Sequence, residues 1–94
     1  MNTDQKGFLQ TDEFKDDPEY EFEGVLLKFN DDVCNAMSDK KINRSELGRR
    51  IGTTRAYISR MLNGTPNMTL FTMVKVACAL GKELVCDLRE KEPT

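Results

Sequence analysis

The amino-acid sequence predicts an all-α domain of four main helices with a short C-terminal β-strand. Apolar residues recur every three or four positions in four segments between residues 17 and 81. Capping residues precede these segments, and glycines at positions 52, 64 and 81 follow three of them. Residues 83–89 hold an apolar cluster that is too short for a further helix, and this pattern favours a strand.

The first helix is predicted over residues 17–38. Asp17 is a helix-capping residue, and Pro18 suits the first turn. Five apolar side chains then recur every three or four residues, which predicts one buried face. They are Phe22, Leu26, Phe29, Val33 and Met37. Residues 1–16 are polar and charged without sustained periodicity, so we expect them to form a mobile acidic tail.

The second and third helices are short and separated by only a few residues. Asn43 is the predicted N-cap of the second helix, with Glu46 at the reciprocal position of a capping box. Gly52 is expected to end this helix in the left-handed conformation. Thr54 is the predicted N-cap of the third helix. Three apolar residues are predicted to face inward from the third helix: Ile58, Met61 and Leu62.

Gly48 lies in the middle of the second helix, where glycine costs roughly 1 kcal/mol relative to alanine. Because so few residues join the second helix to the third, the two helices must cross steeply. Their backbones would then come close together near Gly48, and a large side chain would block the approach. We therefore expect close packing at this glycine.

The fourth helix is predicted to begin near Thr69 and to stop at Gly81. Its predicted apolar stripe comprises Leu70, Met73, Val74, Ala77, Cys78 and Leu80. In the strand that follows, Leu84, Cys86 and Leu88 would share one face. A lone strand is unstable, so we expect it to pair with the same strand of a second subunit and form a homodimer. The domain would thus span residues 17–81, and residues 82–94 would supply the dimerisation strand and a tail.

Charge is distributed unevenly along the chain, although the formal net charge is only −2. Residues 1–39 hold 11 acidic and 3 basic side chains, whereas residues 40–64 hold 7 basic side chains and 1 acidic side chain. Because the field within a Debye length governs local attraction, this basic stretch could bind phosphate even on an acidic protein. The charge count alone is equally compatible with a solvated surface.

Several classes of protein are disfavoured. The chain has no histidine, no glycine-rich phosphate loop and no recognisable carboxylate pair, so we expect no enzymatic activity, no metal and no cofactor. No apolar run approaches the ~20 residues of a membrane span, and the first ten residues lack the pattern of a signal peptide; we therefore expect a cytoplasmic protein. Cys34, Cys78 and Cys86 have no paired spacing and lie among apolar neighbours, which predicts reduced and mostly buried thiols.

Residues 44–64, RSELGRRIGTTRAYISRMLNG, resemble without gaps the helix-turn-helix of the lambdoid phage repressor and Cro family, also called the XRE family. The resemblance rests on the spacing of Gly48, Gly52 and Ile58. The apolar residues that would pack between the two helices are Leu47, Ile51 and Met61. The likeness extends through TLFTMVKVACALG, covers about residues 18–89, and implies a lambda-repressor-like domain that binds duplex DNA.

The resemblance implies that the helix starting at Arg55 enters the major groove. Arg55 and Arg60 would reach base edges, and Thr54, Ala56 and Tyr57 would lie near bases, methyl groups or sugars. Arginine suits this role because its guanidinium donates two parallel hydrogen bonds to guanine O6 and N7.

The resemblance also implies phosphate contacts at Arg44 and Asn63, which match positions where the family grips the DNA backbone. Arg49 and Arg50 are equally compatible with phosphate contacts and with solvated helix positions. Thr53 and the pair Ala56-Tyr57 depart from the residues that are commonest in the family, so the target sequence stays open while the predicted fold does not change.

Three uses of this domain are distinguished. The first is a transcriptional regulator, repressor-like, whose output is DNA binding. The second is a type II antitoxin resembling the HigA group, which would bind its own promoter and neutralise a small basic toxin; the segments DDPEYEFEG and ELVCDLRE resemble the flanks of some such antitoxins. The third, a protein-binding adaptor, is disfavoured because it has no need of exposed arginines.

Overall fold

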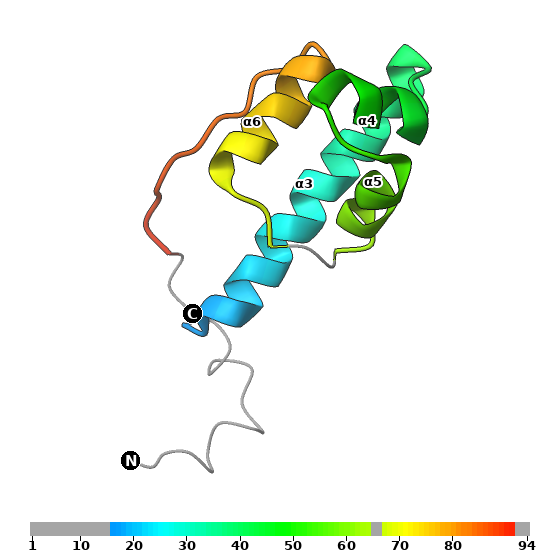
Figure 1. The fold of residues 1–94 in the computed structure, drawn as a ribbon. Helices are drawn as coiled ribbons and strands as arrows, with labels where there is room; N and C mark the ends of the chain where they lie inside the picture. Colours follow the sequence, from blue (N-terminus) through cyan, green and yellow to red (C-terminus); the bar gives the residue numbers. More distant parts are fainter. Residues whose placement is uncertain (1–15, 65–66, 92–94) are drawn as a thin grey trace.

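The computed structural model describes residues 16–64 and 67–91, which fold into four helices (Figure 1). They are α3 (Pro18–Lys40), α4 (Arg44–Ile51), α5 (Arg55–Leu62) and α6 (Leu70–Ala79). The three shorter helices pack around the C-terminal part of α3, whose first turns extend beyond them (Figure 1). The all-α prediction is confirmed over these residues. The predicted tail, residues 1–16, lies outside the described residues except for Asp16, and so do residues 92–94.

Local signals fix both ends of α3. The Asp17 carboxylate accepts the backbone N–H two residues further on at 3.0 Å, as the capping pattern predicted. The helix continues two residues past the predicted end at Ser38, because the chain leaves it only at Lys41, which adopts the left-handed conformation with a φ of 58°. The N–H groups of Lys41 and Ile42 donate to the carbonyls of Ser38 and Met37. Ile42 is buried, so this turn anchors the connection to α4 in the core.

One hydrophobic core joins the four helices in the described part of the chain. Its least exposed side chains come from α4, α5 and the end of α6 and are Leu47, Ile58, Met61, Val76 and Leu80. The predicted inward residues of α3 that are buried are Leu26, Phe29, Val33 and Met37. Phe22, predicted on the same face, is 42% exposed. That part of the prediction is wrong because the first turns of α3 extend beyond the other helices.

α6 turns a different face to the core from the one predicted. Val76 and Ala77 are the buried residues of α6, and Leu80, the residue that follows the helix, is also buried. Leu70 and Val74 are exposed, and so is Cys78, so the predicted stripe is wrong at these three positions. They recur every four residues and form a second apolar face. The single chain leaves this second face uncovered.

All three cysteines are exposed, and the prediction of buried thiols is wrong. Cys34 follows the buried Val33, but an α-helix turns by about 100° per residue, so the two side chains point in different directions. Cys78 lies on the uncovered face of α6, and Cys86 lies in the segment that follows. Apolar neighbours in the sequence therefore do not establish burial on a helix.

The C-terminal segment, residues 82–91, contains no strand within the single chain. It runs beside α3 toward the start of that helix (Figure 1), where Lys91 Nζ lies 3.1 Å from the Asp16 carboxylate and 3.5 Å from that of Glu21. A groove of about 840 Å³ lies between the segment and the first half of α3. Val85 and Leu88 are exposed. The missing strand agrees with the instability of an unpaired strand.

Candidate nucleic-acid interface

A tight corner joins α4 to α5. Gly52 ends α4 in the left-handed conformation with a φ of 80°, as predicted. The Thr53 N–H donates to the Gly48 carbonyl at 2.8 Å. A Cβ added at Gly48 would lie 3.0 Å from both the Thr53 carbonyl oxygen and the Thr54 carbonyl carbon. The predicted close approach at Gly48 is confirmed, and backbone atoms occupy the space that a side chain would need.

The predicted N-caps of both helices are also confirmed. Asn43 Oδ1 accepts the backbone N–H of Glu46 at 2.8 Å, and Thr54 Oγ1 accepts that of Tyr57 at 3.0 Å. The reciprocal half of the capping box is different from the prediction. The Glu46 carboxylate accepts hydrogen bonds from Arg49 and Arg50 instead of turning back to Asn43.

Three of the predicted base-reading residues of α5 are exposed, whereas the fourth, Tyr57, is half-buried and packs against the core. Ile58 and Met61 are fully buried, whereas Arg55, Ala56 and Arg60 are exposed. Tyr57 is half-buried, and the Arg60 guanidinium lies over the Tyr57 ring at 5.6 Å from its centroid. The ring is therefore placed to restrict the directions in which Arg60 can point.

The two predicted phosphate contacts lie at either end of this arrangement. Arg44, the first residue of α4, is half-buried, and its Nη1 donates to Ser59 Oγ on α5 at 3.1 Å. Asn63 is exposed and follows α5 directly, with its backbone N–H donating to the carbonyls of Ser59 and Arg60. The fold thus brings Arg44 next to α5, although Arg44 and Ser59 are 15 positions apart in the sequence.

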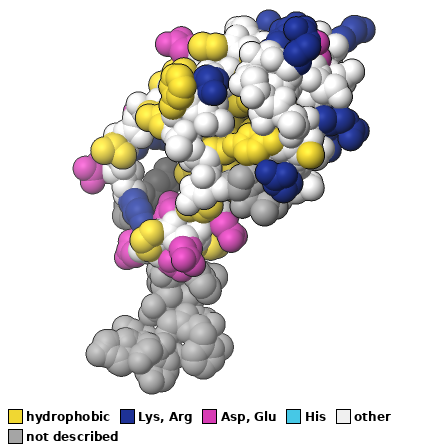
Figure 2. All heavy atoms as spheres, in the orientation of Figure 1, with side chains coloured by type: hydrophobic (Ala, Val, Ile, Leu, Met, Phe, Trp, Pro, Cys, Tyr) yellow, Lys and Arg dark blue, Asp and Glu magenta, His cyan; other side chains and the backbone are white. Residues whose placement is uncertain are grey.

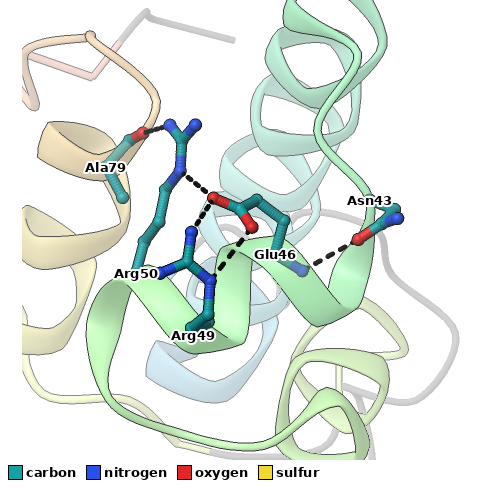
Figure 3. A network of polar contacts seen from close by, with 5 residues as sticks. All are labelled: Asn43, Glu46, Arg49, Arg50 and Ala79. Atoms are coloured by element: carbon teal, nitrogen blue, oxygen red, sulfur yellow. Dashed lines mark hydrogen bonds and ion pairs between the residues drawn. The ribbon is translucent and has the colours of Figure 1, made fainter.

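A network of charges connects α4 to α6 (Figure 3). Glu46 Oε2 lies 2.6 Å from Arg49 Nη2 and 2.8 Å from Arg50 Nε. Arg50 also donates from Nη1 to the Ala79 carbonyl at the end of α6, at 2.9 Å. Hydrogen bonds from Arg50 and then Arg49 hold the pKa of Glu46 below its ordinary value. Both arginines are therefore held by Glu46 within the chain, and Arg49 is the more exposed of the two.

Sequence reasoning missed two residues that hold α5 in place. Ser59 accepts the hydrogen bond from Arg44, and Asn30 on α3 donates from Nδ2 to the Met61 carbonyl at 2.8 Å. Asn30 could have been found from the sequence, because it is a polar residue four positions after Leu26 and therefore lies on the inward face predicted for α3. Ser59 carries no such signal, because its contact depends on the angle at which α4 and α5 cross.

The charges separate on the molecular surface. Lys and Arg side chains gather over the part that contains α4 and α5, whereas Asp and Glu side chains gather around the start of α3 (Figure 2). The basic surface therefore coincides with the exposed side of the α4–α5 corner and lies away from the acidic end of the molecule.

Within the described ranges, no helix is long and apolar enough to cross a lipid bilayer.

A helix-turn-helix family model matches residues 39–85, which is half of the 94-residue chain and includes α4, α5 and α6. No curated protein and no solved structure matches the chain at a significant level. The matched range contains the corner at Gly52 and the exposed arginines of α5.

Proposed function

Because the chain belongs to the helix-turn-helix family, of the XRE type, we propose that it is a repressor-like transcriptional regulator that binds a specific duplex DNA sequence. One observation carries this proposal. The corner at Gly52 holds α5 so that Ile58 and Met61 are buried while Arg55 and Arg60 face solvent. A short exposed helix on a rigid corner is the arrangement that enters a major groove in helix-turn-helix proteins.

The base-reading role is assigned to α5. Arg55, at the exposed start of the helix, would donate two hydrogen bonds to the O6 and N7 atoms of a guanine. Arg60, five residues further along, would reach a second base edge, with its direction restricted by the Tyr57 ring. Thr54, Ala56 and Tyr57 would lie near bases, thymine methyl groups or sugars. The Ala56 methyl group is exposed and suits an apolar contact with thymine.

The phosphate-binding role is assigned to Arg44 and Asn63. These residues lie at the start of α4 and directly after α5, so they bracket the helix that would lie in the groove. The hydrogen bond from Arg44 to Ser59 orients the guanidinium beside α5 before DNA arrives. Phosphate contacts of this kind set the register of the protein on the duplex and carry no sequence information themselves.

The DNA-bound form is proposed to be a homodimer. The uncovered face of α6 and the C-terminal segment expose a set of large apolar side chains: Leu70, Phe71, Val74, Val85 and Leu88. Large apolar side chains that are left exposed are typical of interaction sites where they gather into a patch. Pairing of residues 82–89 between two copies would complete the predicted strand. A two-fold axis there would place two α5 helices about 34 Å apart to read a palindromic site.

Selection of bound duplexes from a random library, at a stated salt concentration, tests the proposed function. A regulator of this kind is expected to enrich one palindromic sequence and to bind it at least about 1,000-fold more tightly than random duplex. Binding that is equal for all sequences would contradict the proposal. The salt dependence of the random-duplex affinity gives the number of phosphate contacts independently.

A HigA-like antitoxin is the second candidate function, favoured by the acidic start of α3 and by the apolar groove beside it. The groove is lined by α3 and by the C-terminal segment, and acidic side chains at its edge include Glu23 and Asp87. In this alternative the groove would bind a small basic toxin while α5 binds the promoter. Expression together with the neighbouring gene product distinguishes the two. A basic protein that forms a stoichiometric complex, and whose toxicity this chain abolishes, would favour the antitoxin.

A further inference from the structure

Asn30 is a buried polar side chain in a face of α3 that is otherwise apolar. It is 6% exposed and lies among the inward residues Leu26, Phe29 and Val33. Its Nδ2 donates to the backbone carbonyl of Met61, near the end of α5, at 2.8 Å. Its Oδ1 is buried and has no hydrogen-bond partner in the described part of the chain.

The amide of Asn30 contributes little to stability as it stands. A buried acceptor without a partner costs about as much free energy as one ordinary hydrogen bond returns. The Met61 carbonyl does not depend on Asn30, because it also accepts the N–H of Gly64 at 3.0 Å. An apolar side chain of similar volume would therefore stabilise the core at least as well. The advantage of asparagine at this position must come from the direction of its hydrogen bond.

The end of α5 is a place where direction matters. α5 has only eight residues, and a cavity of about 400 Å³ lies between α3 and the turn that follows α5. The cavity is lined by residues of both elements, including Leu26, Leu62 and Asn63. Apolar packing alone thus leaves this side of the helix end partly open. A hydrogen bond has a preferred distance and angle, so it restricts rotation and tilt of this helix end more sharply than partly open packing does.

We propose that Asn30 is a positioning residue for DNA recognition. By holding the Met61 carbonyl, Asn30 fixes the tilt of α5, and so places Arg55 and Arg60 in register with base edges that Asn30 itself does not touch. This inference rests on the proposed function of α5 as the base-reading helix. It makes Asn30 a determinant of sequence specificity and not of stability.

The test replaces the amide with an apolar side chain of similar size, Asn30→Leu. The matched control is Asn35→Leu, at an exposed position of the same helix. Affinities for the library-selected duplex and for a random duplex are measured at one salt concentration, together with urea unfolding. For Asn30→Leu, the ratio of the two affinities is expected to fall about fivefold or more, the size of a misaligned base contact. Its random-duplex affinity and its unfolding midpoint are expected to stay at or above the wild-type values.

The outcomes separate the possible roles. An unchanged ratio for Asn30→Leu would overturn the assignment of Asn30, and so would an equal loss on both duplexes together with a lowered unfolding midpoint. Asn30→Ala, which removes the hydrogen bond without adding bulk, must show the same fall in the ratio if Asn30→Leu fails to fold. A wild-type chain without preference for any duplex would overturn the proposed function itself, and the role of Asn30 with it.

Discussion

The α-carbon of Gly48 packs against the backbone of Thr53, and a Cβ there would lie only 3.0 Å from the Thr53 carbonyl oxygen. The same pair is joined by a hydrogen bond from the Thr53 N–H to the Gly48 carbonyl. Two backbone segments that touch and bond in this way cannot slide past one another. The corner that carries α5 is therefore rigid because of contacts between backbones, which no rotation of a side chain can relieve.

Gly48→Ala is expected to lower the free energy of unfolding by about 1 kcal/mol. The added methyl group overlaps backbone atoms, which typically costs about 1–3 kcal/mol, and the higher helix propensity of alanine offsets roughly 1 kcal/mol of it. Gly24→Ala is the matched control, because nothing lies within 4 Å of a Cβ at that position. The control should raise stability through propensity alone. Urea unfolding measures both, and equal effects of the same sign would contradict the tight corner.

Arg55→Ala and Arg44→Ala are expected to weaken DNA binding in different ways. Loss of a base contact at Arg55 should cost about 1–3 kcal/mol on the selected duplex and relax the preference at one base pair. Loss of a phosphate contact at Arg44 should weaken binding to all sequences alike and reduce the salt slope by about one. Titrations of specific and random duplex over a range of salt make the comparison. If Arg55→Ala lost equal affinity on both duplexes, Arg55 would have no base-reading role.

Acid should weaken the fold partly through Glu46. Its pKa is lower in the folded chain, first because of the hydrogen bond from Arg50 and then because of that from Arg49. A carboxylate of this kind stabilises the fold above its unfolded pKa, and the contribution is lost as the pH falls through its folded pKa. Glu46→Gln is therefore expected to lower the free energy of unfolding at neutral pH. Below the ordinary glutamate pKa of 4.5, the free energy of unfolding of this variant should fall less than that of the wild type.

Urea unfolding at neutral and acid pH measures this effect. Glu23→Gln is the control, because Glu23 is exposed and makes no ion pair in the described part of the chain. Between neutral and acid pH, the free energy of unfolding of the control should fall as much as that of the wild type. A Glu46→Gln variant with the wild-type pH dependence would show that the two arginines do not stabilise the fold through this carboxylate.

The wild-type chain is expected to be a dimer at micromolar concentration, and Leu88→Lys is expected to shift it toward the monomer. Leu88 is fully exposed in the single chain, so the change should leave the monomer fold intact. Asn35→Lys is the control, since Asn35 is also exposed but lies on α3 outside the groove beside the C-terminal segment. Light scattering after size-exclusion chromatography gives the mass. A monomeric wild type, or equal dissociation in both variants, would contradict dimerisation through residues 82–89.

The features that could be predicted from the sequence are those decided within one or two turns of chain. Asp17, Asn43, Thr54 and Thr69 each accept a backbone N–H two or three residues ahead, as expected for capping residues. Gly52 takes the left-handed conformation for the same kind of local reason. Caps and turn glycines are readable because their partners lie a few bonds away and depend little on the rest of the fold.

Contacts between helices were not predictable in this way. The bonds from Arg44 to Ser59, from Arg50 to Ala79 and from Asn30 to Met61 span 15, 29 and 31 positions, so they depend on how the helices cross. The face of α6 was misassigned because α6 is apolar on two sides, and the spacing of apolar residues does not say which side the chain itself covers. The C-terminal strand needs a partner that a single chain does not supply.

The proposed contact between Arg55 and a guanine in the major groove can be measured by changing the protein and the DNA together. The selected duplex is prepared with 7-deazaguanine at one guanine at a time, which removes the N7 acceptor, and each duplex is titrated with wild-type protein and with Arg55→Ala. At one guanine, the change to 7-deazaguanine should weaken binding of the wild type by about 1–3 kcal/mol. The same change should leave binding of Arg55→Ala almost unaltered. If every guanine gave the same loss with both proteins, Arg55 would not contact a base, and the proposed docking of α5 would be wrong.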